Sequence, residues 1–280
     1  MNPSPAFSYP RVLSIAGSDS GGGAGVQADL KTIAALGCYG MTAITALTAQ
    51  NTLGVRSIHA VPHQILTDQI DAVVEDIGVD AVKIGMLHSA DTVRTVAAAL
   101  RKHHLRQVVL DPVMIATSGA VLIDREAIDV LVQELFPLAV LVTPNLDEAA
   151  LLVGRPLASE DDMQAAATRL LDRGAAAVLL KGGHLPGDTV SDLLLVRGAA
   201  PLWMRAPRIA SGNTHGTGCT LSTAIASHLA LGADLEQAVR KARDFVRAAL
   251  QAGAQVRTGA GGGPLNHGHA PVPTHLRPLR

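Results

Sequence analysis

The sequence predicts an α/β fold with three layers, in which helices cover both faces of a central, mostly parallel sheet. Strand-length apolar runs alternate with amphipathic helical segments along most of the 280 residues, and this order is typical of parallel strands joined by helices. Aromatic residues make up only 2% of a chain that is 48% hydrophobic. Ala, Val, Leu and Ile must therefore fill the core, as they do in strands buried on both faces.

The first half of the chain begins this alternation. The run RVLSIAGS at 11–18 is apolar and ends in Gly-Ser, which predicts a strand followed by a loop. The segment AGVQADLKTIAALG has apolar residues at helical spacing and ends at Gly37, a candidate C-cap. Two further pairs follow, with strands predicted at 40–51 and 80–86 and helices at 63–78 and 89–104.

The second half of the chain continues the pattern. It predicts strands at 106–114, 138–145, 175–183 and 189–196, and helices at 124–136, 146–153, 159–174, from 217 onward and at 233–254. No internal repeat and no linker divides the chain. We therefore expect one domain over residues 11–256, preceded by a flexible segment at 1–10 and followed by a Gly/Pro/His-rich segment at 257–280 that is partly disordered.

Charge and apolar patterning exclude several classes of partner. The formal net charge is -1 at pH 7, so the chain has no basic footprint for nucleic acid or an anionic membrane. The apolar runs are too short to cross a bilayer, and the polar N-terminus lacks the apolar stretch of a signal peptide. The two cysteines, Cys38 and Cys219, form no disulfide framework and are typical of a reducing compartment. We expect a cytoplasmic protein.

Polar clusters follow the ends of several predicted strands. They lie at 17–25, 50–51, 83–86, 111–112, 143–145 and 181–184. In open α/β sheets, ligands bind at the carboxyl ends of the strands. Because the clusters converge on that one edge, we expect the functional site there.

The glycine-rich loop GSDSGGGAG at 17–25 has several interpretations. GAGVQA overlaps it and matches the GxGxxA dinucleotide fingerprint as a string, but it begins several residues beyond the strand, and no acidic residue closes the next strand. We therefore favour a loop that closes over a small polar ligand, with a flexible turn as the alternative. Asp29, on the following helix, either accepts hydrogen bonds from that ligand or is a solvated helix carboxylate.

The motif NTHGTGCTLS at 213–222 predicts an anion site. Gly216, Thr217 and Gly218 precede a helix, where free N–H groups and the helix dipole favour negative charge. The chain has no GxxxxGK[ST] run, so a phosphate would have to bind at this motif. Cys219 lies on the first turn, where the helix dipole lowers a thiol pKa and favours a proton acceptor. The alternative is a cysteine that packs as a small hydrophobe.

Three further segments predict metal and phosphate contacts. In TPNLDEAALL, Asn145 is a favoured helix N-cap, and Glu148 shares its face. With Asp111 at a neighbouring strand end, Glu148 would hold Mg²⁺ through waters, the alternative being a cap and a surface carboxylate. Lys181 ends an apolar strand and either meets a phosphate or is a surface lysine. The tail histidines lie near no cysteine or carboxylate cluster, so we expect no metal there.

In combination these motifs are specific. They occur in the order AGSDSGGGAGVQADLKT, YGMTAITALTAQNT, KIGM, LDPVM, TPNLDEAALL, LLKGGH and NTHGTGCTLS. The chain therefore closely resembles the hydroxymethylpyrimidine/phosphomethylpyrimidine kinases of thiamine biosynthesis, which belong to the ribokinase-like superfamily. The resemblance extends from Arg11 to Ala254, and it implies the ribokinase-like form of the α/β fold.

The resemblance implies two successive phosphorylations with ATP and Mg²⁺, first of 4-amino-5-hydroxymethyl-2-methylpyrimidine and then of its monophosphate. It implies a pyrimidine pocket lined by Gly17, Asp29, Gln50 and Met86. It implies contacts to ATP phosphate and Mg²⁺ at Asp111, Asn145, Glu148, Lys181, Thr214 and Thr217, with Asp111 and Glu148 as the metal ligands. It also implies an anion hole formed by Gly216 and Gly218 and a catalytic base, Cys219, where many sugar kinases of the superfamily have aspartate.

Two alternatives stay open at this point. Some relatives with this cysteine phosphorylate vitamin B6 compounds, so a pyridoxal or pyridoxine kinase is the nearer alternative, although Gln50 and Met86 favour the pyrimidine. The other is a non-catalytic, pyrimidine-binding regulatory protein, and the presence of the whole catalytic set argues against it. The resemblance also implies that the protein forms a homodimer and that it binds a small-molecule pyrimidine as its substrate.

Overall fold

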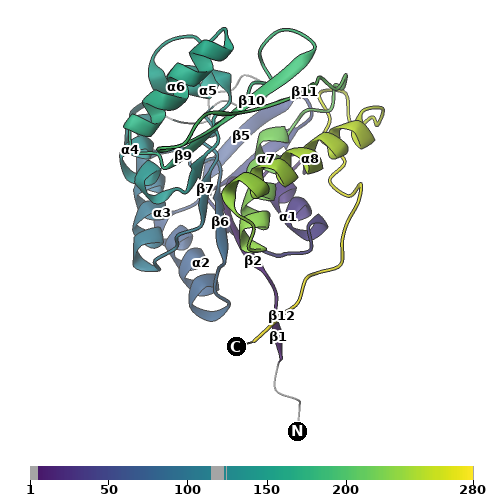
Figure 1. Ribbon diagram of the computed structural model, residues 1–280. Coiled ribbons are helices and arrows are strands. Elements are labelled where there is room, and N and C mark those ends of the chain that lie inside the picture. Colours follow the sequence, from purple (N-terminus) through teal and green to yellow (C-terminus); the bar gives the residue numbers. More distant parts are fainter. Residues whose placement is uncertain (1–5, 115–122, 124, 280) are drawn as a thin grey trace.

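The computed structural model describes residues 6–114, 123 and 125–279. Its middle layer is an eight-stranded sheet (Figure 1). The spatial order is β11 (Leu202–Pro207), β10 (Thr189–Val196), β9 (Ala177–Leu180), β8 (Leu141–Val142), β7 (Val108–Leu110), β6 (Ala81–Ile84), β2 (Arg11–Ala16) and β3 (Tyr39–Ile44). The strands from β9 to β3 pair in parallel, and β10 is antiparallel to both of its neighbours. The predicted class, a mostly parallel α/β sheet, is confirmed.

Helices cover both faces of this sheet (Figure 1). One face is covered by α1 (Gly25–Ala35), α7 (Thr217–Ala230) and α8 (Leu235–Gly253). The other is covered by α2 (His63–Asp76), α3 (Ala90–Lys102), α4 (Arg125–Leu135) with the short 3-10 turn Phe136–Leu138, α5 (Leu146–Val153) and α6 (Glu160–Asp172). The layers are therefore those that the sequence predicts.

Each face of the sheet has its own apolar core, because successive strand residues point to opposite faces. In β2, Leu13 and Ile15 pack with the residues of α2 to α6, whereas Val12 packs with those of α1, α7 and α8. By the same alternation, Ser14 of β2 and Lys83 of β6 point toward α1 and α7, and the two residues are neighbours across the ladder. Two buried polar side chains thus interrupt, at one place, the apolar core between the sheet and the helices α1, α7 and α8.

The segment 40–51 forms two strands rather than the single strand that we predicted. β3 ends at Ile44, and the next strand, β4 (Ala46–Asn51), leaves the main sheet to pair antiparallel with β5 (Gly54–Ala60). The Thr45 hydroxyl between them donates to the Met86 carbonyl at 2.7 Å, which fixes the bend. β5 is largely exposed, so its sequence lacks the apolar signal of a buried strand.

Both end segments make contacts where the structure describes them, but residues 1–5 of the segment that we predicted to be flexible lie outside the described residues. The flexibility of the two segments stays a prediction. Near the start, β1 (Phe7–Ser8) pairs antiparallel with β12 (Arg277–Pro278). In the closing segment, Leu265 and His267 are buried, and the Thr220 hydroxyl of α7 lies 2.9 Å from His267 Nε2. Because these contacts tie the segment after residue 257 to α7, it packs as part of the same folded unit.

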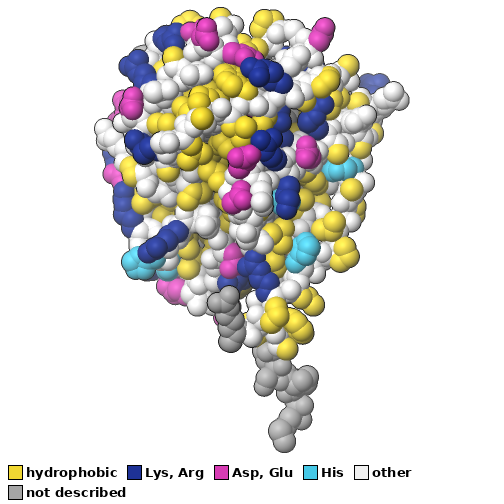
Figure 2. Space-filling model, in the orientation of Figure 1, with side chains coloured by type: hydrophobic (Ala, Val, Ile, Leu, Met, Phe, Trp, Pro, Cys, Tyr) yellow, Lys and Arg dark blue, Asp and Glu magenta, His cyan; other side chains and the backbone are white. Residues whose placement is uncertain are grey.

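The surface carries charges of both signs. Figure 2 shows Lys and Arg side chains interspersed with Asp and Glu over the face that it presents. This pattern agrees with the formal net charge of -1. Within the part of the chain that the structure describes, no helix combines the length and the apolar character needed to cross a membrane.

Candidate active site

A cavity of about 590 Å³ lies where the parallel strands end. Ligands of open α/β sheets bind at this edge. The structure brings to its wall every site residue that the sequence predicts except Asp29: Gly17, Gln50, Met86, Asp111, Asn145, Glu148, Lys181, Thr214, Gly216, Thr217, Gly218 and Cys219. Motifs spread over two hundred residues of sequence thus converge on one space.

The start of α7 forms one end of this cavity. Gly216 has a left-handed backbone with φ of 81°, and a Cβ there would lie 1.9 Å from the Gly23 carbonyl oxygen, so only glycine fits. A Cβ on Gly218 would instead lie 3.1 Å from Lys181 Nζ. Because the first N–H groups of a helix lack partners within it, the start of α7 offers donors to an anion beside Lys181.

Cys219 lies on this first turn, half-buried in the cavity wall. We predicted that the start of the helix lowers its pKa, but burial raises the pKa of the Cys219 thiol to about 11. The Lys83 ammonium acts in the opposite direction, whereas the Asp29 and Asp111 carboxylates raise the pKa further. At neutral pH Cys219 is therefore mainly the thiol. The burial that decides this is not visible in the local sequence.

Lys181 lies between two carboxylates at the same end of the cavity. Its Nζ is 2.8 Å from Asp111 Oδ1 and 3.9 Å from Glu148 Oε2. Burial disfavours the charged lysine, but these carboxylates outweigh burial and raise the pKa of Lys181. The side chain is 13% exposed and lines the cavity, so it is a site cation rather than the surface lysine of the alternative interpretation.

Asn145 and Glu148 begin α5 as a reciprocal cap. The Asn145 side chain accepts from the Glu148 N–H at 2.9 Å, and Glu148 Oε2 accepts from the Asn145 N–H at 2.8 Å. Glu148 is only 3% exposed, which excludes the surface carboxylate of the alternative. Burial raises the pKa of Glu148 to about 7, while Lys181 lowers it and Asp111 raises it.

The glycine-rich loop is organised by Asp19, which the sequence analysis did not single out. Its carboxylate accepts the N–H groups of Gly21, Gly23 and Ala24 at 2.8, 3.0 and 2.9 Å, and it lies 2.9 Å from His215 Nε2. Burial acts to raise the pKa of Asp19, but the hydrogen bonds outweigh it, and the pKa is lowered. An aspartate before a glycine run favours a turn that its own side chain closes, and that signal was available in the sequence.

Gly17, Met86 and Gln50 line the other end of the cavity. A Cβ on Gly17 would lie 2.4 Å from Met86 Cε, so glycine leaves room for the Met86 side chain. Gln50 accepts from the Thr48 hydroxyl at 3.2 Å, and its Nε2 lies 3.4 Å from His215 Nε2. An amide donor and acceptor beside an apolar wall suits a flat heteroaromatic ring with polar edges.

Asp29 does not line the cavity, which differs from our prediction. It is fully buried, and its carboxylate accepts hydrogen bonds from Lys83, Ser14 and Thr223. The face of α1 that carries Asp29 packs against the sheet and α7 rather than against the cavity. Neither a ligand acceptor nor a solvated carboxylate describes it.

The sequence analysis also missed three arginines in the cavity wall, Arg208, Arg243 and Arg247. Arg243 Nε lies 2.7 Å from Asp192 Oδ2, which holds that guanidinium in place. Arg243 and Arg247 are one turn apart on α8, and this spacing on an amphipathic helix was visible in the sequence.

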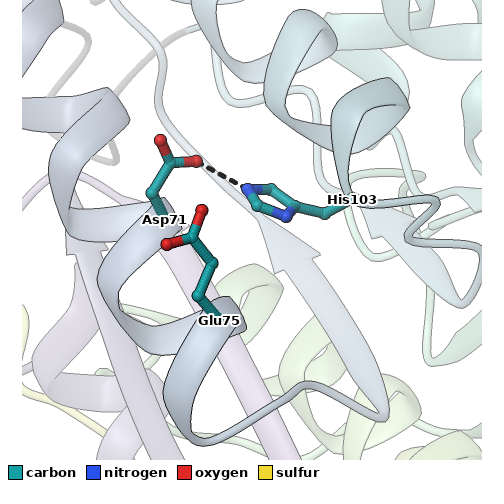
Figure 3. Close-up of side chains that lie close together, drawn as sticks. All are labelled: Asp71, Glu75 and His103. Carbon is teal, nitrogen blue, oxygen red and sulfur yellow. Dashed lines mark hydrogen bonds and ion pairs between the residues drawn. The ribbon is translucent and has the colours of Figure 1, made fainter.

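A second cluster lies outside the cavity wall. Figure 3 shows Asp71 and Glu75 of α2 and His103, which follows α3, pointing toward one another. His103 Nε2 lies 2.6 Å from Asp71 Oδ1, but Lys102 Nζ lies 2.7 Å from Asp71 Oδ2 and 3.5 Å from Glu75 Oε1. Because a lysine already neutralises these carboxylates, we assign no metal to this cluster.

Known proteins resemble this chain over most of its length. The family model described as phosphomethylpyrimidine kinase matches residues 19–266. The hydroxymethylpyrimidine/phosphomethylpyrimidine kinase of Rhizobium meliloti is 50% identical over 258 residues, which cover 92% of this chain and 96% of that protein. The thiamine biosynthesis bifunctional protein of Geobacter sulfurreducens is 54% identical over 262 residues, 92% of this chain, but this chain spans only 53% of that longer protein.

Solved structures confirm the fold. The pyridoxal kinase of Bacillus subtilis, solved as an ADP complex, superimposes with a TM-score of 0.86 at 35% identity, over 93% of this chain and 98% of that one. It has the ribokinase-like form of the α/β sheet that the sequence predicts. The family match spans most of the chain and includes nearly every residue of the cavity wall. The chain therefore belongs to the phosphomethylpyrimidine kinase family.

Proposed function

We propose that this chain transfers a phosphoryl group from ATP to the hydroxymethyl group of 4-amino-5-hydroxymethyl-2-methylpyrimidine, and then a second one to the resulting monophosphate. The observation that carries the proposal is the arrangement of the cavity. Gln50 and Met86 line an end suited to a flat polar ring, and Lys181 and Cys219 line an end suited to a phosphoryl group. The ADP complex of the Bacillus subtilis relative supports ATP as the donor.

The first step needs positioning and charge stabilisation more than covalent chemistry. The acceptor oxygen attacks the γ-phosphorus, the bond from that phosphorus to the bridging oxygen breaks, and ADP leaves with the bridging oxygen. The amides at the start of α7 and the Lys181 ammonium stabilise the charge on the phosphoryl oxygens. The Cys219 sulfur accepts the proton of the acceptor hydroxyl when it is the thiolate, which is the minor form at neutral pH because burial raises its pKa.

The second step makes a different demand on Cys219. The acceptor is now a phosphate monoester, whose second pKa is about 6, so it is ionised at neutral pH and has no proton to give up. The same helix amides and Lys181 serve both steps, whereas the proton acceptor serves only the first.

Asp111 and Glu148 are the residues that would hold Mg²⁺. Both carboxylates lie within reach of the Lys181 ammonium, so they face one small space. Mg²⁺ is commonly held by one or two carboxylates together with waters and substrate phosphates, and this donor set fits it. When bound, the ion neutralises charge on the phosphates of the nucleotide.

A pyridoxal kinase is the second candidate. Its support is the superposition on the Bacillus subtilis pyridoxal kinase, and Gln50 offers hydrogen bonds that a pyridine can also use. The higher identity to the Rhizobium meliloti kinase favours the pyrimidine. Membership of a kinase family argues against a non-catalytic binding protein.

A coupled ADP-release assay with ATP and Mg²⁺ tests both candidates. Hydroxymethylpyrimidine, its monophosphate and pyridoxal are compared in the parent and in Cys219→Ala, with Cys38→Ala as the matched cysteine control. We expect turnover of both pyrimidines and little of pyridoxal. Cys219→Ala should lower kcat by roughly a hundredfold or more in the first step, the size of a lost general base, and much less in the second.

Preference for pyridoxal would identify pyridoxal as the substrate and would leave the proposed phosphate site unchanged. Binding of a pyrimidine without ADP release would sink the kinase proposal. Equal losses in both steps would show that Cys219 does not act as the proton acceptor.

A further inference from the structure

Lys83 is a fully buried lysine that takes no direct part in the proposed reaction. Lys83 and Asp29 are both 0% exposed, and neither lines the cavity. A buried ion pair contributes little net stability, because the cost of desolvating both charges offsets their attraction. Stability is therefore a weak reason for this pair.

Asp29 joins four elements at one point. It lies on α1 and accepts from Ser14 of β2 at 2.5 Å, from Lys83 of β6 at 2.8 and 3.0 Å, and from Thr223 of α7 at 2.6 Å. Thr223 is one turn after Cys219 and on the same side of α7. The pair therefore holds the helix one turn behind the group that accepts the proton.

The Asp111 carboxylate contacts Ser222, the residue before Thr223 on α7. The Ser222 hydroxyl donates to Asp111 Oδ2 at 3.3 Å, and Asp111 pairs with Lys181. The two lysines differ in exposure. Lys181 lines the cavity and can exchange its carboxylate for a phosphate, whereas Lys83 is sealed in the core and keeps Asp29.

The space around the Lys83 ammonium is closely filled. A Cβ on Gly85 would lie 2.9 Å from Lys83 Nζ and 3.0 Å from the Ala16 Cβ. The ammonium therefore has a fixed place between the sheet and α7. Its charge lowers the pKa of the Cys219 thiol, against the larger effect of burial.

We propose that Lys83 and Asp29 form a buried positioning pair for phosphoryl transfer. Through Thr223 the pair fixes the first turns of α7, so that Cys219 and the helix amides keep their places beside the acceptor. Lys83 also supplies a fixed positive charge behind Cys219. The effect on turnover rests on the proposed function, whereas the effect on the thiol does not depend on any substrate.

The hydrogen bond to α7 is tested by Thr223→Val, which keeps the shape of the side chain and removes its hydroxyl. Thr223→Ser keeps the hydroxyl, and Thr32→Val is the matched control, a buried threonine of α1 whose hydroxyl donates to the Ala28 carbonyl of the same helix. We expect Thr223→Val to lower kcat roughly tenfold or more with KM nearly unchanged, because small misplacements of reacting groups are costly. Thr223→Ser should restore most of the rate.

The charge is tested by the balanced double variant Lys83→Met/Asp29→Asn, which leaves no unpaired buried ion. In a Cys38→Ser background, the rate at which iodoacetamide alkylates Cys219 is measured without substrate at about pH 8.5, since the thiolate is the reactive form. We expect alkylation to slow by roughly twofold in the double variant, because the loss of the Lys83 charge outweighs the loss of the Asp29 charge that opposes it, and to match the parent in Thr32→Val.

The proposal is overturned if Thr223→Val keeps the kcat of Thr32→Val and the double variant keeps its alkylation rate, whatever happens to Tm. That result would leave the pair a purely structural one. If the parent phosphorylates no pyrimidine, the proposed function fails by itself, and the alkylation rates still decide the role of the pair.

Discussion

At the scale of single residues, the two glycines of the Gly-Thr-Gly motif have different roles. Gly216 is required by its left-handed backbone and by the Gly23 carbonyl 1.9 Å from the position of a Cβ. Gly218 is helical, and a Cβ there would meet only the flexible end of Lys181 at 3.1 Å and Asp111 Oδ2 at 3.6 Å. The first glycine serves the fold, and we propose that the second keeps the space beside Lys181 open for a phosphoryl group.

Alanine at each position separates these roles. We expect Gly216→Ala to lower the free energy of unfolding by roughly 2 kcal/mol or more, through the strained backbone and the clash. Gly218→Ala should keep or slightly raise Tm, because alanine favours a helix by about 1 kcal/mol over glycine, while kcat falls roughly tenfold or more. Thermal melts and ADP release measure both. A stable Gly216→Ala would contradict the close contact with Gly23.

The site residues were predictable where a motif carried them and not where packing decided. Gly216, Lys181 and Glu148 follow strand ends or begin helices, and such positions can be read from one sequence. Asp29 lies on the face of α1 that packs against the sheet and α7, outside the cavity wall. Periodicity alone does not predict which element a helix face will contact. The pKa of Cys219 likewise depends on burial by segments far away in the chain.

At the scale of elements, α7 depends on the closing segment of the chain. The His215 N–H donates to the Gly263 carbonyl at 3.1 Å, and Thr220 on the first turn of α7 lies 2.9 Å from His267 Nε2. The sequence predicted the helix from its glycines but treated the closing segment as partly disordered, because Gly, Pro and His lack periodicity. Its contact with α7 joins Thr220 to His267, 47 positions apart in the sequence, and no local pattern reports such a contact.

Acid should weaken this contact. Burial lowers the pKa of His267 to about 4, below its ordinary value near 6.5. The unfolded chain therefore binds this proton first, and stability is lost as pH falls from about 6.5 toward 4. We expect Tm to drop between pH 7 and pH 5, and to drop less in His267→Gln.

His228, on the last turn of α7, is the matched control for that experiment. Burial lowers its pKa to about 4 as well. His228→Gln should therefore also reduce the drop in Tm between pH 7 and pH 5. Only the change at His267 touches the first turn of α7, and only that variant should also lower kcat. Equal kcat in both variants would show that the closing segment does not support the site.

At the scale of the whole molecule, the sheet separates two apolar cores and gathers the charged groups at its carboxyl edge. Lys181, Asp111 and Glu148 are largely buried there, and burial raises the pKa of Glu148 to about 7. The alternation of strands and helices made this architecture predictable. The β4–β5 ribbon was predicted only in part: the predicted strand at 40–51 includes β4 and Gln50, whereas β5 is largely exposed and lacks the apolar signal of a buried strand.

Glu148 makes the stability of the whole protein depend on pH. Its folded pKa is raised above the ordinary value, so the folded protein favours the neutral acid, and stability is lost as pH rises from about 4.5 to 7. We expect Glu148→Gln, which keeps the capping acceptor, to raise Tm by a few degrees at about pH 8 and to change it little at about pH 4. Glu126→Gln, an exposed residue of α4, is the control. A Tm gain that does not vary with pH would contradict the raised pKa.

The pairing of β1 with β12 has a consequence for engineering. It brings residues 7 and 278 together at the amino end of the parallel strands, whereas the cavity opens at the carboxyl end (Figure 1). A short peptide could join these two positions, and the chain could be reopened at a surface turn, without crossing the cavity. A circularly permuted enzyme built in this way would keep its site, and a fluorescent reporter attached at the join would sit well away from the substrates.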